Sequence, residues 1–299
     1  MLRSRVAGAG AVGSGSVPTI LITGAAGRVG TVLRSRLARP GRVLRLLDVA
    51  SLVPPPGPGE EAVTASVTDL AAMTAACAGA DAVIHLGGIP TEDAWAPILD
   101  VNINGTYNVF EAARRARVPR VVFASSNHAV GFEPRSSFPV PDDAAPVPDT
   151  YYGVSKAAGE ALAGLYARRY GLQAICVRIL SCFDRPMNPR MLATWLSPDD
   201  AGRLFEACLT APAPGFRVIY GVSANTRGGW VSLDGARALG YEPLDDAERY
   251  APEVLAAAGI PAAASGQPGP AWPDPADPVF RYLGGEFTLP SRDAPIPPR

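Results

Sequence analysis

A glycine-rich turn that directly follows a short apolar run constrains this fold more than any other feature of the chain. Residues 19–23 read Thr-Ile-Leu-Ile-Thr, which is typical of a strand buried on both faces of a parallel sheet. The next residues carry glycines at a G-x-x-G-x-x-G spacing, at Gly24, Gly27 and Gly30. These glycines permit a tight turn, close approach of backbone to a phosphate, and close helix–strand packing. With a helix predicted over residues 29–38, the pattern predicts a dinucleotide site.

Strands and helices alternate through the first 180 residues. We expect strands at residues 19–23, 42–48, 62–66, 82–86, 121–124 and 173–179, the last completing the sheet, with helices between them. The helix before the fifth strand should be long, from Pro97 to Ala116. After residue 179 we expect a loop over residues 183–198 and a further strand at residues 216–220, outside that sheet. Because every connection is strand–helix–strand, the sheet should be parallel, with right-handed crossovers. The pattern predicts a Rossmann-type doubly wound α/β fold over residues 18–180 and a small C-terminal substrate-capping region over residues 181–299. Residues 1–17, rich in Gly, Ala and Ser, are expected to form a disordered leader.

The second strand ends in an acidic residue, Asp48, at a position that suits the adenosine ribose. Its carboxylate can accept hydrogen bonds from the ribose hydroxyls, and it would repel a 2′-phosphate. Arg28 inside the turn could contact such a phosphate, but the carboxylate favours NAD over NADP.

A tyrosine and a lysine, Tyr152 and Lys156, stand four residues apart and therefore on one face of a predicted helix. A phenol has an ordinary pKa near 10, so alone it is a poor base at neutral pH. A nearby ammonium favours the phenolate and makes it a usable acid/base. The preceding strand ends in two hydroxyls, Ser125 and Ser126, which strengthens this interpretation. Together with the turn, the pair predicts a nicotinamide-dependent oxidoreductase.

Composition and charge exclude several other classes of protein. The 299 residues carry a formal net charge of -1, and no apolar run approaches the ~20 residues needed to span a bilayer. Neither nucleic acid nor a membrane is therefore expected as a partner. The four cysteines show no C-x-x-C spacing and are expected to be reduced thiols in a cytoplasmic protein. With only two histidines no metal site is expected, and His85, inside a strand, is expected to be a hydrogen-bonded core residue.

Five motifs resemble those of the extended short-chain dehydrogenase/reductases, the NAD-dependent epimerase/dehydratase superfamily. They are T-G-A-A-G-R-V-G (residues 23–30), H-L-G-G (85–88), F-A-S-S-N-H (123–128), Y-G-V-S-K (152–156) and R-M-L-A-T-W (190–195). The third and fifth are much narrower than the others and are most similar to uronate dehydrogenases. The resemblance runs from about residue 19 to residue 287.

The resemblance implies a role for each matching residue. Tyr152 would be the acid/base, Lys156 would lower its pKa and hold the nicotinamide ribose, and Ser126 would bind the reacting oxygen. Asn102 would support the lysine through a water molecule. The remaining cofactor contacts would come from Gly24, Gly27, Arg28, Val29, Gly30, Asp48, Ser66, Val67, Leu86, Gly87, Gly88 and Ile179. The substrate would be bound by Ser126, Asn127, His128, Ser181, Arg190 and Phe287, with Arg190 gripping a carboxylate.

Two positions depart from the uronate dehydrogenase pattern. Pro90 stands where those enzymes carry a substrate-contacting serine, and proline has no N–H or hydroxyl to donate. Ser66-Val67-Thr68-Asp69 replaces an Asp-Leu-x-Asp stretch that holds adenine, which suggests a weaker adenine contact.

The function expected from these motifs is oxidation of a uronic acid (glucuronate or galacturonate) at its anomeric carbon to the aldarolactone, with NAD as acceptor. One alternative is a nucleotide-sugar epimerase or dehydratase on the same fold, and another is a non-catalytic dinucleotide-sensing relative. Relatives pair through two long helices, so a homo-oligomer is expected.

Overall fold

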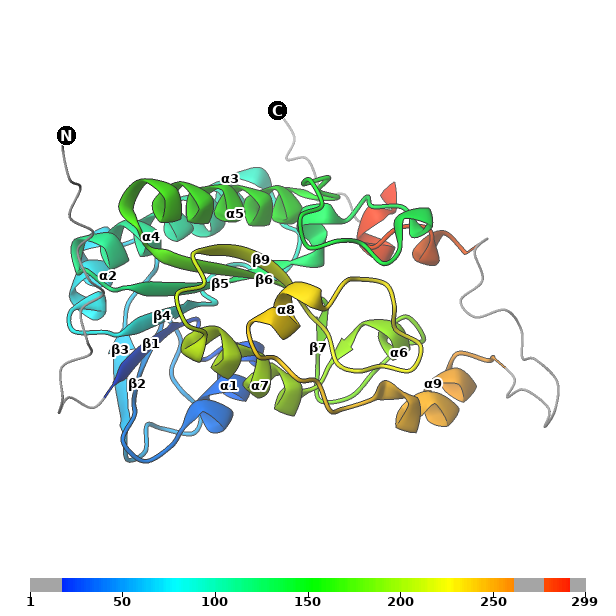
Figure 1. Ribbon diagram of the computed structural model, residues 1–299, viewed down its shortest axis with the longest axis horizontal. Coiled ribbons are helices and arrows are strands. Elements are labelled where there is room, and N and C mark those ends of the chain that lie inside the picture. Colours follow the sequence, from blue (N-terminus) through cyan, green and yellow to red (C-terminus); the bar gives the residue numbers. More distant parts are fainter. Residues whose placement is uncertain (1–17, 261–276, 291–299) are drawn as a thin grey trace, which may run out of the picture.

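The computed structural model describes residues 18–260 and 277–290 (Figure 1). The predicted leader at residues 1–17 lies outside the described residues. Within residues 18–260 and 277–290, no helix combines the length and the apolar composition that crossing a bilayer would require.

A single seven-stranded sheet forms the centre of the fold, and all of its neighbouring strands are parallel. The strand order is β3-β2-β1-β4-β5-β6-β9. This order reverses between β1 and β4, as in other doubly wound folds, so the predicted fold class is confirmed. The strands are β1 (Thr19–Thr23), β2 (Val43–Asp48), β3 (Glu60–Thr64), β4 (Ala82–His85), β5 (Arg120–Ser126), β6 (Gln173–Ile179) and β9 (Phe216–Gly221).

The prediction that residues 173–179 complete the sheet is wrong, because β9 adds a seventh strand beside β6. The chain reaches β9 through α7 (Pro198–Thr210), so this crossover repeats the strand–helix–strand pattern of the earlier units. Without β9, the backbone edge of β6 would have no strand partner on that side. The sheet therefore extends beyond residue 180.

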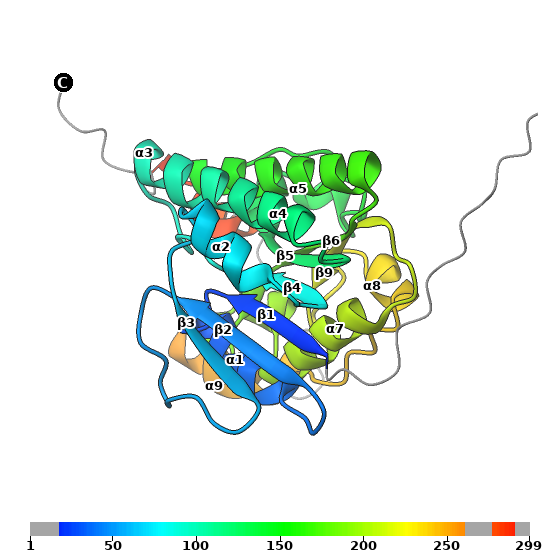
Figure 2. The ribbon, with the colours of Figure 1, turned by 90° about the vertical axis from the view of Figure 1, so that its left-hand side faces the viewer.

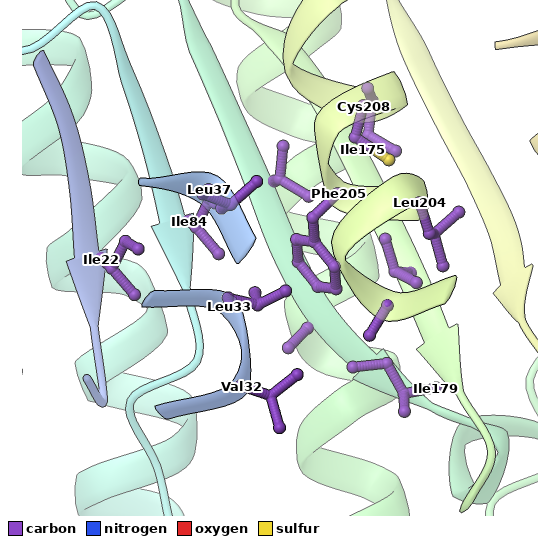
Figure 3. Packing of buried hydrophobic residues seen from close by; sticks show 14 of the residues in the cluster. Ile22, Val32, Leu33, Leu37, Ile84, Ile175, Ile179, Leu204, Phe205 and Cys208 are labelled. Atoms are coloured by element: carbon purple, nitrogen blue, oxygen red, sulfur yellow. The ribbon is translucent and has the colours of Figure 1, made fainter. Parts of the chain in front are cut away.

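Helices cover both faces of the sheet (Figures 1 and 2). α1 (Arg28–Leu37), α7 and α8 (Asp234–Ala238) pack on one face. α2 (Leu70–Cys77), α4 (Gly105–Arg115) and α5 (Tyr151–Tyr170) pack on the other. Side chains alternate along each strand, so Ile20 and Ile22 belong to the first core and Leu21 belongs to the second. Figure 3 shows the first core, where Leu33 of α1 and Phe205 of α7 lie over the strands.

The predicted long helix from Pro97 to Ala116 is interrupted. A short helix α3 (Trp95–Pro97) continues into a π-helical segment, η1 (Ile98–Asn104), and only then into α4. Such π segments occur frequently at functional sites. Gly105 follows the segment directly, and a Cβ there would lie 2.7 Å from Val67 Cγ2. The glycine thus lets the helix pass close to the loop that follows β3.

The region after β6 contains more regular structure than the sequence predicts. Residues 183–198, predicted as a loop, contain α6 (Met191–Thr194) and β8 (Trp195–Leu196), which pairs in parallel with β7 (Ser181–Cys182). Trp195 and Leu196 are fully buried, which explains why this segment is regular. The remaining elements are α9 (Ala251–Ala257) and the 3-10 turns η2 (Asn127–Val130), η3 (Arg135–Ser137), η4 (Ala247–Tyr250), η5 (Pro278–Phe280) and η6 (Gly285–Thr288).

Candidate active site

The glycine turn after β1 is in direct contact with the loop that follows β4. Gly24 has a φ of +70°, and a Cβ there would lie 2.7 Å from Gly87 N. A Cβ at Gly30 would lie 2.3 Å from Gly24 O, so neither position has room for a side chain. Among the described residues, no side chain caps the N-terminus of α1 at Gly27. The first amides of that helix, from Arg28 to Gly30, therefore face the turn as donors for a pyrophosphate, and the turn fits a dinucleotide.

Asp48 lies beside this turn, at the end of β2. Its Oδ2 accepts a hydrogen bond of 2.9 Å from Ala26 N, and its Oδ1 accepts one of 3.0 Å from Ala50 N. The structure thus brings the ribose-binding candidate to the phosphate-binding candidate. A half-buried carboxylate at this point disfavours a 2′-phosphate, in keeping with NAD.

The other predicted adenine-side residues lie close by. Val67 Cγ1 would be 2.8 Å from a Cβ at Gly87, so the loops after β3 and β4 touch. The Ser66 hydroxyl is hydrogen-bonded to the Thr68 hydroxyl at 2.8 Å. Leu86 N donates to Thr23 O at 3.1 Å, which continues the ladder of β1 and β4 toward the turn. The Arg28 guanidinium lies 4.1 Å from the centre of the Phe183 ring.

Tyr152 and Lys156 are both buried in the first turns of α5, over the end of β5. Burial raises the pKa of Tyr152 to about 12, although a hydrogen bond with Ser126 opposes the rise. Burial also lowers the pKa of Lys156 to about 8. Lys156 Nζ donates to Ala124 O at 2.8 Å and lies 5.3 Å from the centre of the Tyr152 ring. Burial therefore disfavours each charge taken alone, whereas a phenolate and an ammonium side by side would offset each other.

The chain after Ser126 turns through η2 and places two more predicted residues at the site. Asn127 Nδ2 donates to Leu283 O at 3.2 Å. The His128 ring lies 4.1 Å from the ring of Phe287 and 5.7 Å from that of Tyr152, measured between ring centres. The C-terminal segment at residues 277–290 therefore closes over the end of β5.

Arg190 enters the same region from the loop before α6. Its Nη2 donates to Leu283 O, and its guanidinium lies 5.6 Å from the centre of the Trp230 ring. Its buried Nε has no hydrogen-bond partner among the described residues. Burial lowers the pKa of Arg190 to about 10, while Asp149 and Glu286 act to raise it. The site thus holds a guanidinium with an unused donor.

Two predicted residues, Asn102 and Ser181, make direct contacts with neighbouring protein groups. Asn102 is buried, and its side chain clamps Ile89, accepting from Ile89 N at 2.7 Å and donating to Ile89 O at 3.0 Å. Its Nδ2 also donates to Ser155 Oγ, next to Lys156, at 3.2 Å. Support of Lys156 through water stays a prediction. Ser181 is buried with its hydroxyl 2.9 Å from that of Thr194. Ile179 ends β6 beside Ser126 of β5 in the sheet register.

Sequence reasoning did not find Glu92 or Asp149. Glu92 accepts hydrogen bonds from Tyr152 N at 2.8 Å and Tyr151 N at 3.2 Å, so it ties the loop after β4 to the start of α5. Asp149 contacts His128 at 2.7 Å. The sequence held one signal for Asp149, its place three residues before Tyr152. His85 is a hydrogen-bonded core residue as predicted, held between Thr23 and Thr106.

A model of the NAD dependent epimerase/dehydratase family matches residues 20–190 of this chain. The chain belongs to that family. The predicted family resemblance is confirmed, as is NAD as the cofactor.

Within the NAD dependent epimerase/dehydratase family, the chain is similar to uronate dehydrogenases. One from Pseudomonas putida is 43% identical over 270 residues, which cover 90% of this chain and 95% of that protein. The crystal structure of uronate dehydrogenase from Agrobacterium tumefaciens superposes with a TM-score of 0.81 at 42% identity, covering 92% of this chain and 98% of that one. A mutant of uronate dehydrogenase from Agrobacterium tumefaciens, complexed with NAD, superposes with a TM-score of 0.80 at 42% identity. The match covers 91% of this chain and 97% of that one.

Proposed function

We propose that this protein is an NAD-dependent dehydrogenase that oxidises a free uronic acid, glucuronate or galacturonate, at C1 to the aldarolactone. The observation that carries the proposal is the position of Arg190. Its Nη2 and the side-chain amide of Asn127 donate to the same carbonyl, Leu283 O, and its buried Nε has no partner among the described residues. A planar guanidinium with a free donor matches a carboxylate. The similarity to uronate dehydrogenases over nine-tenths of the chain supports the same substrate class.

In this proposal Ser126 and Tyr152 act on the C1 hydroxyl. NAD, when bound, supplies the hydride acceptor. Ser126 hydrogen-bonds the reacting oxygen, and the Tyr152 phenolate takes the hydroxyl proton as the hydride leaves C1, which gives the lactone carbonyl. Lys156 stabilises the phenolate, because an ammonium beside it offsets the cost of a buried negative charge. His128 and Asn127 bind other hydroxyls of the sugar.

Replacing Arg190 with alanine tests the substrate assignment. We expect kcat/KM for glucuronate to fall. The transition-state stabilisation calculated from this loss should be ~1.5–3 kcal/mol, which is typical of a hydrogen bond to a charged group. Arg190→Lys should recover only part of the loss, because a point charge cannot reproduce the bidentate contact. Glucose, which lacks the carboxylate, should be a poor substrate for the wild type and little affected by either change. An unchanged KM for glucuronate in Arg190→Ala would contradict the carboxylate role.

We also infer that the protein forms a homo-oligomer through α4 and α5. The two helices lie side by side on one face of the molecule (Figures 1 and 2). Leu165 of α5 and Tyr107 of α4 are 47% and 43% exposed, and Leu99 just before α4 is also exposed. Such an apolar surface suits a second copy of the chain.

Leu165→Glu should therefore lower the mass measured by sedimentation to that of a monomer. Leu244→Glu is the matched control, because Leu244 is 70% exposed and lies outside these helices. A wild-type monomer, or an equal effect of both variants, would contradict the pairing through α4 and α5.

The proposal also divides the chain into a cofactor-binding part and a substrate-binding part. Residues 18–180 would bind NAD and carry the Tyr152/Lys156 helix, and residues 181–299 would shape the substrate site through Arg190 and Phe287. A cytoplasmic location is supported by the four cysteines, all of which are buried free thiols.

A further inference from the structure

A buried carboxylate, Asp149, lies next to the candidate active site. Its side chain is 0% exposed, and its Oδ2 is 2.7 Å from His128 Nδ1. Asp149 immediately precedes Thr150, the N-cap of the α5 helix that carries Tyr152. Asp149 is not part of the dinucleotide site, and its side chain is too enclosed to bind a sugar directly.

The backbone encloses this carboxylate on several sides. A Cβ at Gly131 would lie 2.0 Å from Asp149 Oδ2, and one at Gly284 would lie 1.9 Å from the same atom. A Cβ at Gly153 would lie 3.0 Å from Oδ1. These glycines come from the end of η2, the turn before η6 and the first turn of α5. Three separate segments thus leave just enough space for the carboxylate, which holds it rigidly against His128.

Three features of its surroundings offer the Asp149 carboxylate a hydrogen-bond donor or positive charge. Its Oδ1 accepts from the Thr150 hydroxyl at 3.0 Å, and that hydroxyl in turn accepts from Gly153 N at 3.0 Å. The N-terminus of a helix favours a negative charge, and α5 begins here. Arg190 lies near enough to interact electrostatically with Asp149. An ionised carboxylate only accepts hydrogen bonds, so the proton of the contact must belong to His128 Nδ1.

We propose that Asp149 is a positioning residue that holds His128 in its Nδ1–H tautomer, leaving Nε2 as a hydrogen-bond acceptor for a substrate hydroxyl. The His128 ring contacts those of Phe287 and Tyr152, and its Nε2 makes no hydrogen bond to any residue in the described ranges. The carboxylate therefore sets which groups the site recognises: a sugar hydroxyl that donates to Nε2 is bound, and a deoxy position is not. The identity of that hydroxyl rests on the proposed function, whereas the tautomer does not.

The tautomer can be observed directly, because the chain contains only two histidines. His85 provides an internal reference, because it has the opposite tautomer. The Thr106 hydroxyl donates its only proton to Asn102 O at 2.5 Å, so it accepts from His85 Nε2 at 3.1 Å. The proton of His85 is therefore on Nε2, and its Nδ1 accepts from the Thr23 hydroxyl. Burial lowers the pKa of His85 to about 3, so it stays neutral.

Long-range proton–nitrogen NMR of the ¹⁵N-histidine-labelled protein should show one histidine of each tautomer. The spectrum is recorded at about pH 8, above the ordinary histidine pKa of about 6.5. His128→Gln assigns the two sets of signals. We expect the proton on Nδ1 of His128 and on Nε2 of His85. An Nε2–H tautomer of His128 in the wild type would overturn the proposal, whether or not the protein oxidises a uronate.

Asp149→Asn provides the functional arm. The Thr150 hydroxyl would keep donating to the side-chain oxygen, so the amide NH₂ would face His128 Nδ1 and move the imidazole proton to Nε2. We expect kcat/KM for glucuronate to fall at least about 10-fold, the effect of losing one substrate hydrogen bond. The affinity for NAD, from fluorescence titration, should be unchanged. Asp81→Asn, the same change at the amino end of β4, is the control.

A double-mutant cycle separates tautomer control from a purely structural role. In a His128→Gln background, Asp149→Asn should cost little more, because no imidazole remains to be oriented. An equal loss with and without His128 would overturn the proposal. If Asp149→Asn does not fold, the wild-type spectrum alone decides between the two tautomers.

Discussion

Replacing Tyr152 with phenylalanine should lower turnover of glucuronate by a factor of about 10²–10⁴, the usual contribution of a positioned acid/base. The ring would still pack against His128 and over the end of β5, so the fold and the NAD site should persist. The measurement is the steady-state rate of NADH formation, together with a titration of NAD binding.

Tyr151→Phe is the matched control for this experiment. Tyr151 is the neighbouring tyrosine, but its side chain is 48% exposed and its ring contacts Trp95 at the surface. It should retain wild-type activity. If Tyr152→Phe kept most of its activity, the proton would have to move through another group.

Arg178→Met should lower the free energy of unfolding by about 3–5 kcal/mol, because it leaves a buried carboxylate without its partner. Arg178 is 2% exposed and Glu160 is 5% exposed. Nε and Nη2 of Arg178 donate to the two Glu160 oxygens at 2.9 and 2.8 Å. Glu160 Oε1 also accepts from the Ser125 hydroxyl at 2.6 Å. This pair joins β6 to α5, one turn after Lys156.

Denaturant unfolding measures this effect, with Arg36→Met as the control. Arg36 pairs with Asp199 at 2.9 Å, but their side chains are 33% and 65% exposed, so that loss should stay within about 1 kcal/mol. Adding Glu160→Gln to Arg178→Met should recover part of the stability, since the uncompensated charge is then gone. A loss below about 1 kcal/mol in Arg178→Met would show that the buried pair contributes little.

Local patterns predicted the dinucleotide turn and the Tyr152/Lys156 pair, because each depends on a few consecutive residues. Gly24 needs a positive φ, Asp48 ends a strand, and Lys156 follows Tyr152 by one helical turn. Each of these constraints can be seen in the sequence itself. The parallel sheet was predictable for the same reason, from the regular alternation of strands and helices.

The supporting contacts were not predictable, because they join residues that are far apart in the chain. Asp149 and His128 are 21 positions apart, Glu92 and Tyr152 are 60 apart, and Arg190 and Leu283 are 93 apart. No local pattern marks such pairs. The π-helical segment was missed because its residues also suit an ordinary helix, and β9 was placed outside the sheet because its partner β6 precedes it by a long connection.

The most direct test of the account is the initial rate of NADH formation with glucuronate or galacturonate, compared with glucose and with a nucleotide sugar such as UDP-glucuronate. We predict rapid NADH formation with a free uronate, accumulation of the aldarolactone, and little or no reaction with the other two substrates. Equal rates with glucose, or turnover of the nucleotide sugar without the free acid, would contradict the assignment of Arg190 as the carboxylate ligand and of the protein as a uronate dehydrogenase.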